Sequence, residues 1–229
     1  MPVVKKPFEY KDDNGKVYEG LLCYDDAQKG PRPGVLVIHA FGGAGEFEFE
    51  RAEALAELGY VALAADMYGK GIRGKTKEEN FALMGPLVAR DRAKLGRRLK
   101  ASRDALASLD NVDGTKIGAI GYCFGGLCVL DMARRKVEGL KAAISFHGNP
   151  KPFDGMTNDE IHTKIQVHNG EADVHIPKEV ISNFYKEMNE RKADWHFIDH
   201  GQAMHAFTEP HAAQLGVPGI MVNDGPFPA

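Results

Sequence analysis

The chain has 229 residues with 29 basic and 32 acidic side chains, so its formal net charge is −3. This balance argues against nucleic-acid binding as the main function, and no apolar run is long enough to predict a membrane-spanning helix. A chain of this length can bury a full hydrophobic core without disulfides or structural metal, and we expect a single domain over residues 1–229.

Apolar patterning then predicts strands and helices that alternate along the chain. An antiparallel pair comes first, because Asn14-Gly15, a strong hairpin signal, separates two short β-rich stretches. The strands expected after it are 35–38, 61–65, 116–122, 142–146, 165–168 and 195–198. The expected helices are 46–58, 86–109, 124–136 and 177–191, with a loop over 66–85. This alternation predicts an α/β fold: a mostly parallel, twisted sheet of about 7–8 strands with helices on both faces.

A basic cluster from Arg90 to Arg103 falls within the long helix expected over 86–109. Its basic residues alternate with leucines that recur at helical spacing, as Leu95, Leu99 and Leu106 do. Such spacing places the leucines on one face of the helix. We therefore expect the basic cluster to form the solvated side of this helix.

Cysteine usage points to a reducing compartment. The three cysteines, Cys23, Cys123 and Cys128, cannot all pair within the chain, and their spacing is typical of neither a CxxC redox motif nor a zinc site. The N-terminus has no apolar run typical of a signal peptide. We therefore expect a cytoplasmic protein, with Cys23 and Cys128 packed as small apolar residues.

The most informative stretch is Gly121-Tyr122-Cys123-Phe124-Gly125, where an expected strand runs directly into a helix. Such a turn holds its central residue in a strained conformation and presents that side chain above the strand ends. The helix N-terminus favours a thiolate, which is the nucleophilic form of cysteine. The N–H of Phe124 would then donate to the oxyanion of a tetrahedral intermediate. The alternative is a glycine-rich turn around a buried, inert cysteine.

A nucleophile of this kind needs a histidine base and an acid that orients it, and both are expected on loops after later strands. Asp173 follows the strand expected at 165–168, and His205 follows the last expected strand. Glu171 is the rival acid. The alternatives are that Asp173 caps the helix beginning near Pro177 and that His205 is a surface-loop histidine.

At these motifs the sequence resembles the dienelactone hydrolase family. The resemblance extends from about Val17 to Pro210, and further matching segments are 34–39, 58–61, 65–69 and 145–148. It implies an α/β-hydrolase fold with short antiparallel strands at the N-terminus and a cysteine nucleophile. By resemblance, Cys123, Asp173 and His205 match the catalytic triad, and Phe41 matches the residue that gives the second oxyanion-hole N–H.

Two departures from the family concern the site. The family usually has a glutamate after the position of His39, where this chain has Ala40, so we expect Cys123 to rest more fully as a thiolate and to oxidise more easily. Glu46 is a minor candidate to replace that glutamate. The arginine that binds the substrate carboxylate in the family is replaced by Glu209, which should repel an anionic substrate. A different anchor could come from one of three arginines: Arg73, Arg90 or Arg92.

A third departure is at the C-terminus. Residues 215–229 are rich in proline and glycine and cannot form the closing helix that relatives usually carry. Either the chain is truncated or another subunit supplies the cover. An uncovered apolar patch would favour a homo-oligomer.

Aromatic and histidine side chains near the strand ends are expected to line a substrate pocket. They are His39, Tyr68, Tyr122, His147 and Phe207. Tyr68 and Tyr122 could equally pack in the core. A metal site formed by His39, His147 and His168 with Cys123 is conceivable, but hydrogen-bonded histidines are the preferred interpretation, and we expect no metal.

These observations predict a carboxylic ester hydrolase for a small ester or lactone, with a Cys123, His205 and Asp173 triad and no cofactor. The thioester intermediate also leaves acyl transfer open. The alternative is a non-catalytic, redox-sensitive or ligand-binding member of the same fold. A small molecule is the expected partner, with no nucleic acid or membrane.

Overall fold

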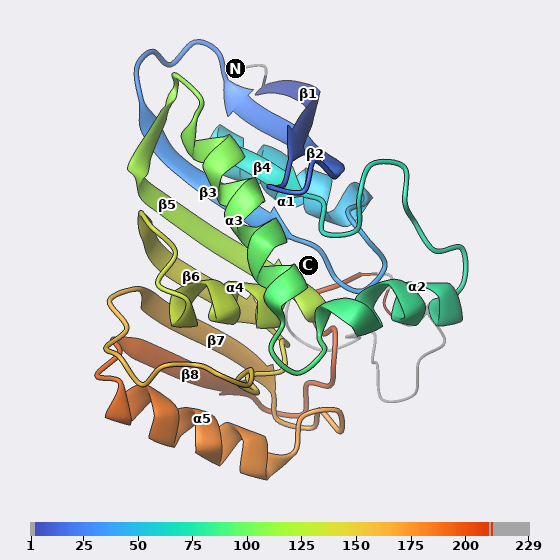
Figure 1. Cartoon of the computed structure of the whole chain (residues 1–229), viewed down its shortest axis with the longest axis vertical. Coiled ribbons are helices and arrows are strands. Elements are labelled where there is room, and N and C mark those ends of the chain that lie inside the picture. Colours follow the sequence, from blue (N-terminus) through green and yellow to red (C-terminus); the bar gives the residue numbers. More distant parts are fainter. Residues whose placement is uncertain (1–2, 211, 213–229) are drawn as a thin grey trace.

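The computed structural model describes residues 3–210 and 212, and within them the chain forms one eight-stranded sheet covered by helices (Figure 1). The strands are β1 (Val3–Lys11), β2 (Val17–Asp25), β3 (Arg32–Ile38), β4 (Val61–Ala65), β5 (Val112–Tyr122), β6 (Leu140–Phe146), β7 (Lys164–Gly170) and β8 (Trp195–His200). The helices are α1 (Glu46–Glu57), α2 (Lys77–Met84), the single-turn η1 (Gly85–Leu87), α3 (Ala93–Ala107), α4 (Phe124–Arg134) and α5 (Lys178–Glu190).

The strand order is β1-β2-β4-β3-β5-β6-β7-β8. β1 and β2 form the predicted antiparallel hairpin and β2 pairs antiparallel with β4, whereas the strands from β3 to β8 pair parallel with one another. The predicted fold class is confirmed. The chain moves in opposite directions along the sheet after β3 and after β5, so a crevice is expected beyond the carboxyl ends of these two strands.

The helices divide between the two faces of the sheet, as right-handed crossovers require. α1 connects β3 to β4 and packs on one face, while α3 and α4 pack on the other (Figure 1). Each residue of α4 is buried, as is usual for a helix at the centre of a sheet. Cys128 lies within it and Cys23 lies on β2, and both thiols are buried as predicted.

The structure corrects the prediction between residues 66 and 92. The expected loop contains α2, whose N-terminus is capped by the hydroxyl of Thr76, which accepts a hydrogen bond from the N–H of Glu79 at 3.2 Å. The expected helix from 86 begins only at Ala93, because Arg92 adopts a left-handed conformation with a φ of 49°. Leucine spacing alone does not reveal this break.

The basic cluster is also only partly solvated. Arg92 is 5% exposed and forms an ion pair with Asp131 of α4, with Nη1 2.8 Å from Oδ1. Arg103 is largely covered as well, with 12% of its side chain exposed. Arg92 therefore belongs to the contact between the start of α3 and α4, whereas Arg103 lies against Gly114 of β5 and Glu138, and the helical pattern could not indicate either contact.

Within the part of the chain that the structure describes, no helix is both long and apolar enough to span a membrane. The expected lack of a closing helix concerns residues 215–229, which lie outside the described residues.

Candidate active site

Cys123 lies at the junction of β5 and α4 in a strained backbone conformation, with a φ of 52°. The flanking glycines make this tight turn sterically accessible. A Cβ on Gly125 would lie 2.0 Å from the carbonyl oxygen of Ile38, and a Cβ on Gly121 would lie 2.1 Å from that of Gly125. The turn therefore packs directly against the end of β3 and leaves the Cys123 side chain partly exposed.

His205 connects the thiol of Cys123 to a buried carboxylate. Its Nε2 lies 3.1 Å from Sγ of Cys123, and its Nδ1 lies 2.7 Å from Oδ2 of Asp173. The other carboxylate oxygen of Asp173 accepts the N–H of His175 at 2.8 Å, which fixes the orientation of the acid. The rival acid, Glu171, is exposed and lies 3.5 Å from the ammonium group of Lys178. The structure thus brings together the three residues that the sequence selected.

The charge of this group follows from its hydrogen bonds. Burial lowers the pKa of His205, but the hydrogen bonds to Asp173 and Cys123 outweigh it and raise the pKa to about 10. His205 is therefore an imidazolium at neutral pH. This cation lies 3.1 Å from the sulfur of Cys123.

His147 holds the turn at Cys123 through a hydrogen bond to its backbone. The backbone N–H of Cys123 donates to Nδ1 of His147 at 3.0 Å, and Nε2 of His147 lies 2.7 Å from the hydroxyl oxygen of Thr208. His147 is fully buried and has a φ of 41°. His147 lies at a strand end as predicted, but its contact with the backbone of Cys123 joins two distant segments and was not predicted.

The two predicted oxyanion-hole residues are buried near each other. Phe124 is the first residue of α4, so its N–H has no acceptor within the helix. Phe41 follows β3, and its carbonyl accepts a hydrogen bond from the hydroxyl of Tyr68 at 2.7 Å. The ring of Tyr68 lies 6.1 Å from the ring of Phe124, and His39 packs against both.

The other expected pocket residues differ in exposure. His39 is fully buried, and its Nε2 accepts the N–H of Met67 at 3.0 Å, so it holds the segment after β4. Burial lowers the pKa of His39 to about 4, so it is neutral. Tyr122 is buried against the ring of Phe146, whereas Phe207 is half-buried against His147.

One buried glutamate near the site, Glu48, was not predicted from the sequence. Glu48, at the third position of α1, accepts the N–H of Gly45 at 3.0 Å and of Ala40 at 3.3 Å, while the proposed substitute Glu46 is exposed. Burial raises the pKa of Glu48. The signal that could have found Glu48 is its position as a helix-capping glutamate three residues after Gly45.

Glu209 lies beside the histidines of the site. Its Oε1 is buried without a hydrogen-bond partner among the described residues and lies 3.8 Å from Nε2 of His147. Burial, together with the charge of Glu48, raises the pKa of Glu209 to about 7. The carboxyl group therefore changes charge near neutral pH.

Three arginines were candidates to anchor a substrate carboxylate. Two of them already have acidic partners, and the third lies exposed. Arg73 pairs with buried Asp66 at 3.2 Å, and Arg92 pairs with Asp131 in the helix layer. Arg90 is exposed. Among the residues that the structure describes, no group of three His, Cys, Asp or Glu side chains could hold a metal ion.

The chain is similar to known proteins both in sequence and in structure. A sequence model of the dienelactone hydrolase family matches residues 19–220. Carboxymethylenebutenolidase 2 of Cupriavidus pinatubonensis is 34% identical over 120 residues, which are 51% of this chain and 45% of that protein. The crystal structure of a dienelactone hydrolase-like promiscuous phosphotriesterase from metagenomic libraries has a TM-score of 0.91 and 33% identity, covering 98% of this chain and 92% of that one.

A more distant solved structure shares the fold. Dienelactone hydrolase from Anabaena variabilis has a TM-score of 0.67 at 21% identity, covering 94% of this chain and 96% of that one. This likeness extends over almost the whole of both chains.

Proposed function

The chain belongs to the dienelactone hydrolase family, and we propose that it hydrolyses small, uncharged esters or lactones through a thioester formed on Cys123. Its relatives make it a hydrolase. The observation that carries the mechanism is the continuous contact from the sulfur of Cys123 through the imidazole of His205 to the carboxylate of Asp173.

In the first half-reaction, the Cys123 thiolate attacks the carbonyl carbon of the ester. The N–H groups of Phe41 and Phe124 stabilise the oxyanion of the tetrahedral intermediate. When the C–O bond breaks, His205 gives its Nε2 proton to the leaving alkoxide, and the acyl group stays on sulfur. The raised pKa of His205 supports this step, because the proton is already present in the resting enzyme.

In the second half-reaction, the neutral His205 takes a proton from water, which attacks the thioester carbonyl. The C–S bond breaks, the acid leaves, and the thiolate and imidazolium are restored. Asp173 holds the imidazole through Nδ1 and stabilises its charge in both steps. Another nucleophile in place of water would give acyl transfer.

Glu209 supports the preference for an uncharged substrate. It is a buried carboxyl group close to His147 and His205, at the position where the family carries a carboxylate-binding arginine. Above pH 7 its negative charge would repel an anionic substrate. We therefore propose neutral lactones and alkyl esters as the substrate class.

A second substrate class is suggested by the similar metagenomic enzyme, which is described as a promiscuous phosphotriesterase. A neutral phosphotriester also carries no charge for Glu209 to repel. Attack of the thiolate on phosphorus would form an S–P bond and expel one alkoxide or aryloxide, which takes the Nε2 proton of His205. Water activated by the neutral His205 would then break the S–P bond and restore the thiolate and imidazolium. We propose weak turnover of such triesters as a side activity.

Turnover of p-nitrophenyl acetate by the full chain tests the main proposal. We expect hydrolysis to fall by about a thousandfold or more in Cys123→Ala and His205→Ala, because members of a triad act as a unit. Asp173→Asn should be severely impaired, since it allows the wrong tautomer of His205. Mass spectrometry of the quenched reaction should detect an acetyl group on Cys123.

The chain offers matched controls for the substitutions at Cys123 and Asp173. Cys128→Ala changes a buried thiol five residues from Cys123, and Glu171→Gln changes the rival acid two residues from Asp173. Both controls should retain activity. Equal background hydrolysis in all variants would instead favour the non-catalytic, ligand-binding alternative.

The location of the protein is a separate proposal. All three cysteines are free, which is usual in a reducing compartment. We propose a cytoplasmic location. Fractionation of cells that express the native protein, followed by labelling of its free thiols, would test it.

A further inference from the structure

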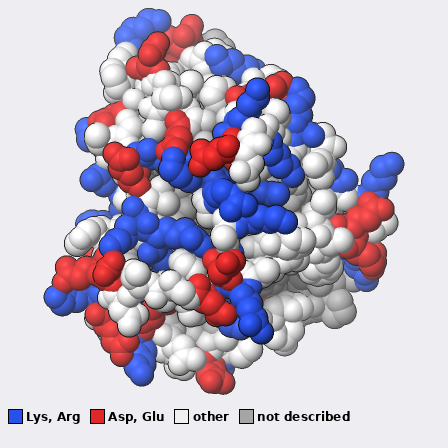
Figure 2. Space-filling model, in the orientation of Figure 1, with Lys and Arg blue, Asp and Glu red and all other residues white. Residues whose placement is uncertain are grey.

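A basic groove lies between α3 and the end of α4, away from the catalytic residues. Its cavity has a volume of about 660 Å³, which is within the usual range for small-molecule sites. Lys and Arg side chains gather across the middle of this face of the molecule (Figure 2). We propose that the groove binds a small polyanion that carries two or more phosphate groups.

The charge of the lining supports an anionic ligand. Six cations and two acids line the cavity: Arg97, Lys100, Arg103, Arg134, Arg135 and Lys136, with Asp104 and Glu138. Their formal charges sum to +4, while the whole chain carries −3. Two acids outside the lining, Glu187 beside Arg134 and Asp159 beside Lys136, offset part of this charge. The positive charge is thus concentrated at one place, although the protein as a whole is acidic.

The existing partners leave part of this charge unbalanced. Asp104 pairs with both Lys100 and Arg103, and Arg103 also lies 3.8 Å from Glu138. Lys136 pairs with Asp159, which does not line the cavity, at 2.6 Å. Arg97 is exposed and has no hydrogen bond or ion pair among the described residues. Arg134 is different, because it is buried and forms a two-bond pair with Glu187, so we assign it no direct role in binding.

Arg135 is held as a fixed donor at the wall of the groove. Its Nη2 donates to the carbonyl groups of Asp91 and Arg92, at 3.0 and 3.2 Å, and its guanidinium lies 4.0 Å from the ring centroid of Phe153. These hydrogen-bond partners are neutral and orient the guanidinium, while the carboxylates of Asp131 and Asp91 act on its charge only through space. Nε of Arg135 is buried without an acceptor among the described residues.

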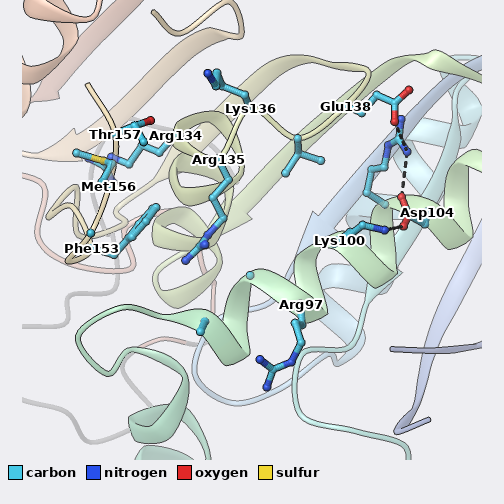
Figure 3. A pocket seen from close by; sticks show the side chains of 15 residues that line it. Arg97, Lys100, Asp104, Arg134, Arg135, Lys136, Glu138, Phe153, Met156 and Thr157 are labelled. Carbon is cyan, nitrogen blue, oxygen red and sulfur yellow. Dashed lines mark hydrogen bonds and ion pairs between the residues drawn. The ribbon is translucent and has the colours of Figure 1, made fainter. Parts of the chain in front are cut away.

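Gly96 gives Arg135 the space to lie against α3. A Cβ at position 96 would lie 2.9 Å from Cζ of Arg135. Figure 3 shows the side chains that line this groove. Arg97 lies on α3, and Arg135 lies beside Phe153.

Phosphate groups fit this lining better than a single carboxylate. Guanidinium groups bind phosphate through paired, charge-assisted hydrogen bonds, and the groove presents arginines from two helices. Two phosphates would allow Arg97 and Arg135 to act together. The groove is also distinct from the catalytic site, because Arg135 is twelve residues beyond Cys123, or about 18 Å along the axis of α4.

Calorimetric titration of the full chain with inorganic pyrophosphate tests the proposal. We expect saturable binding to one site, weakened about tenfold or more in Arg97→Gln and in Arg135→Gln. Lys94→Gln is the matched control, since Lys94 is an exposed cation on α3 that does not line the cavity. Gly96→Ala, which keeps every charge but displaces Arg135, should also weaken binding.

The outcomes separate a built site from general attraction. Arg97 is exposed, so Arg97→Gln tests the proposal even if Arg135→Gln fails to fold. No saturable binding of pyrophosphate at low-millimolar concentration would overturn the proposal. Equal weakening by Lys94→Gln and Arg97→Gln would also overturn it, because it would indicate a diffuse positive field.

Discussion

The backbone N–H of Cys123 donates a hydrogen bond to Nδ1 of His147 at 3.0 Å. Burial, and then the charge of His205, hold the pKa of His147 well below its usual value, so the ring is neutral. With Nδ1 accepting, the ring proton is on Nε2 and is donated to the hydroxyl of Thr208. His147 thus joins the turn that carries Cys123 to the loop that carries His205.

We expect His147→Phe to lower kcat for p-nitrophenyl acetate by about tenfold or more with little change in KM. The reason is that a small displacement of the nucleophile has a large effect on a reaction that depends on orientation. His147→Asn keeps a side-chain acceptor and should restore part of the rate. Equal rates for the Phe and Asn variants would contradict a positioning role for His147.

The raised pKa of His205 predicts how the stability of the fold depends on pH. The pKa rises from 6.5 to about 10 on folding, so the stabilisation is fully present below about pH 6.5 and is lost as the pH rises towards 10. We expect His205→Gln to lower the free energy of unfolding more at pH 5.5 than at pH 9.5, as measured by urea titration. The exposed His196→Gln is the control, and an equal loss at both pH values for His205→Gln would count against the ion pair.

Glu209 predicts a pH-dependent choice between substrates. With its pKa raised to about 7 by burial and by Glu48, the group is neutral in mild acid and negative above that pH. The ratio of kcat/KM for an anionic lactone to that for a neutral lactone should fall about tenfold from pH 6 to pH 8. In Glu209→Gln the ratio should stay constant, and a fall of the same size in that variant would exclude Glu209 as the cause.

Much of the fold and of the geometry of the candidate site could be predicted because both depend on local patterns. Buried parallel strands are short apolar runs, and the strained turn at Cys123 needs the glycines that flank it. The order of nucleophile, acid and histidine then selected Asp173 and His205. In the structure, His205 lies in hydrogen-bond contact with both Asp173 and Cys123.

The missed features depend on contacts between distant segments. Arg92 is one of several arginines in sequence, but α4 brings Asp131 to it and buries the pair. Glu48 and Glu209 are 161 positions apart in the chain, and only the folded sheet places them close enough for one charge to affect the other. The helix α2 was missed because its charged, half-exposed sequence lacks an apolar stripe.

Two glycines of the same strand provide a test of how tightly the nucleophile turn is packed. A Cβ at Gly121 would lie 2.1 Å from the carbonyl oxygen of Gly125, whereas a Cβ at Gly118 would lie no closer than 3.8 Å to any neighbour, the nearest being Val35. We expect Gly121→Ala to lower the free energy of unfolding by about 3 kcal/mol or more, because α4 must move away from β5. Gly118→Ala should change it by less than about 1 kcal/mol.

Gly121→Ala and Gly118→Ala should also differ in their effect on activity. Moving α4 displaces both Cys123 and the N–H of Phe124, so folded Gly121→Ala should lose most of its esterase activity, while Gly118→Ala should keep it. Circular dichroism in urea and p-nitrophenyl acetate turnover measure the two effects on the same samples. Full activity in Gly121→Ala would mean that the turn tolerates a wider spacing, and the strained geometry at Cys123 would then not be required for attack.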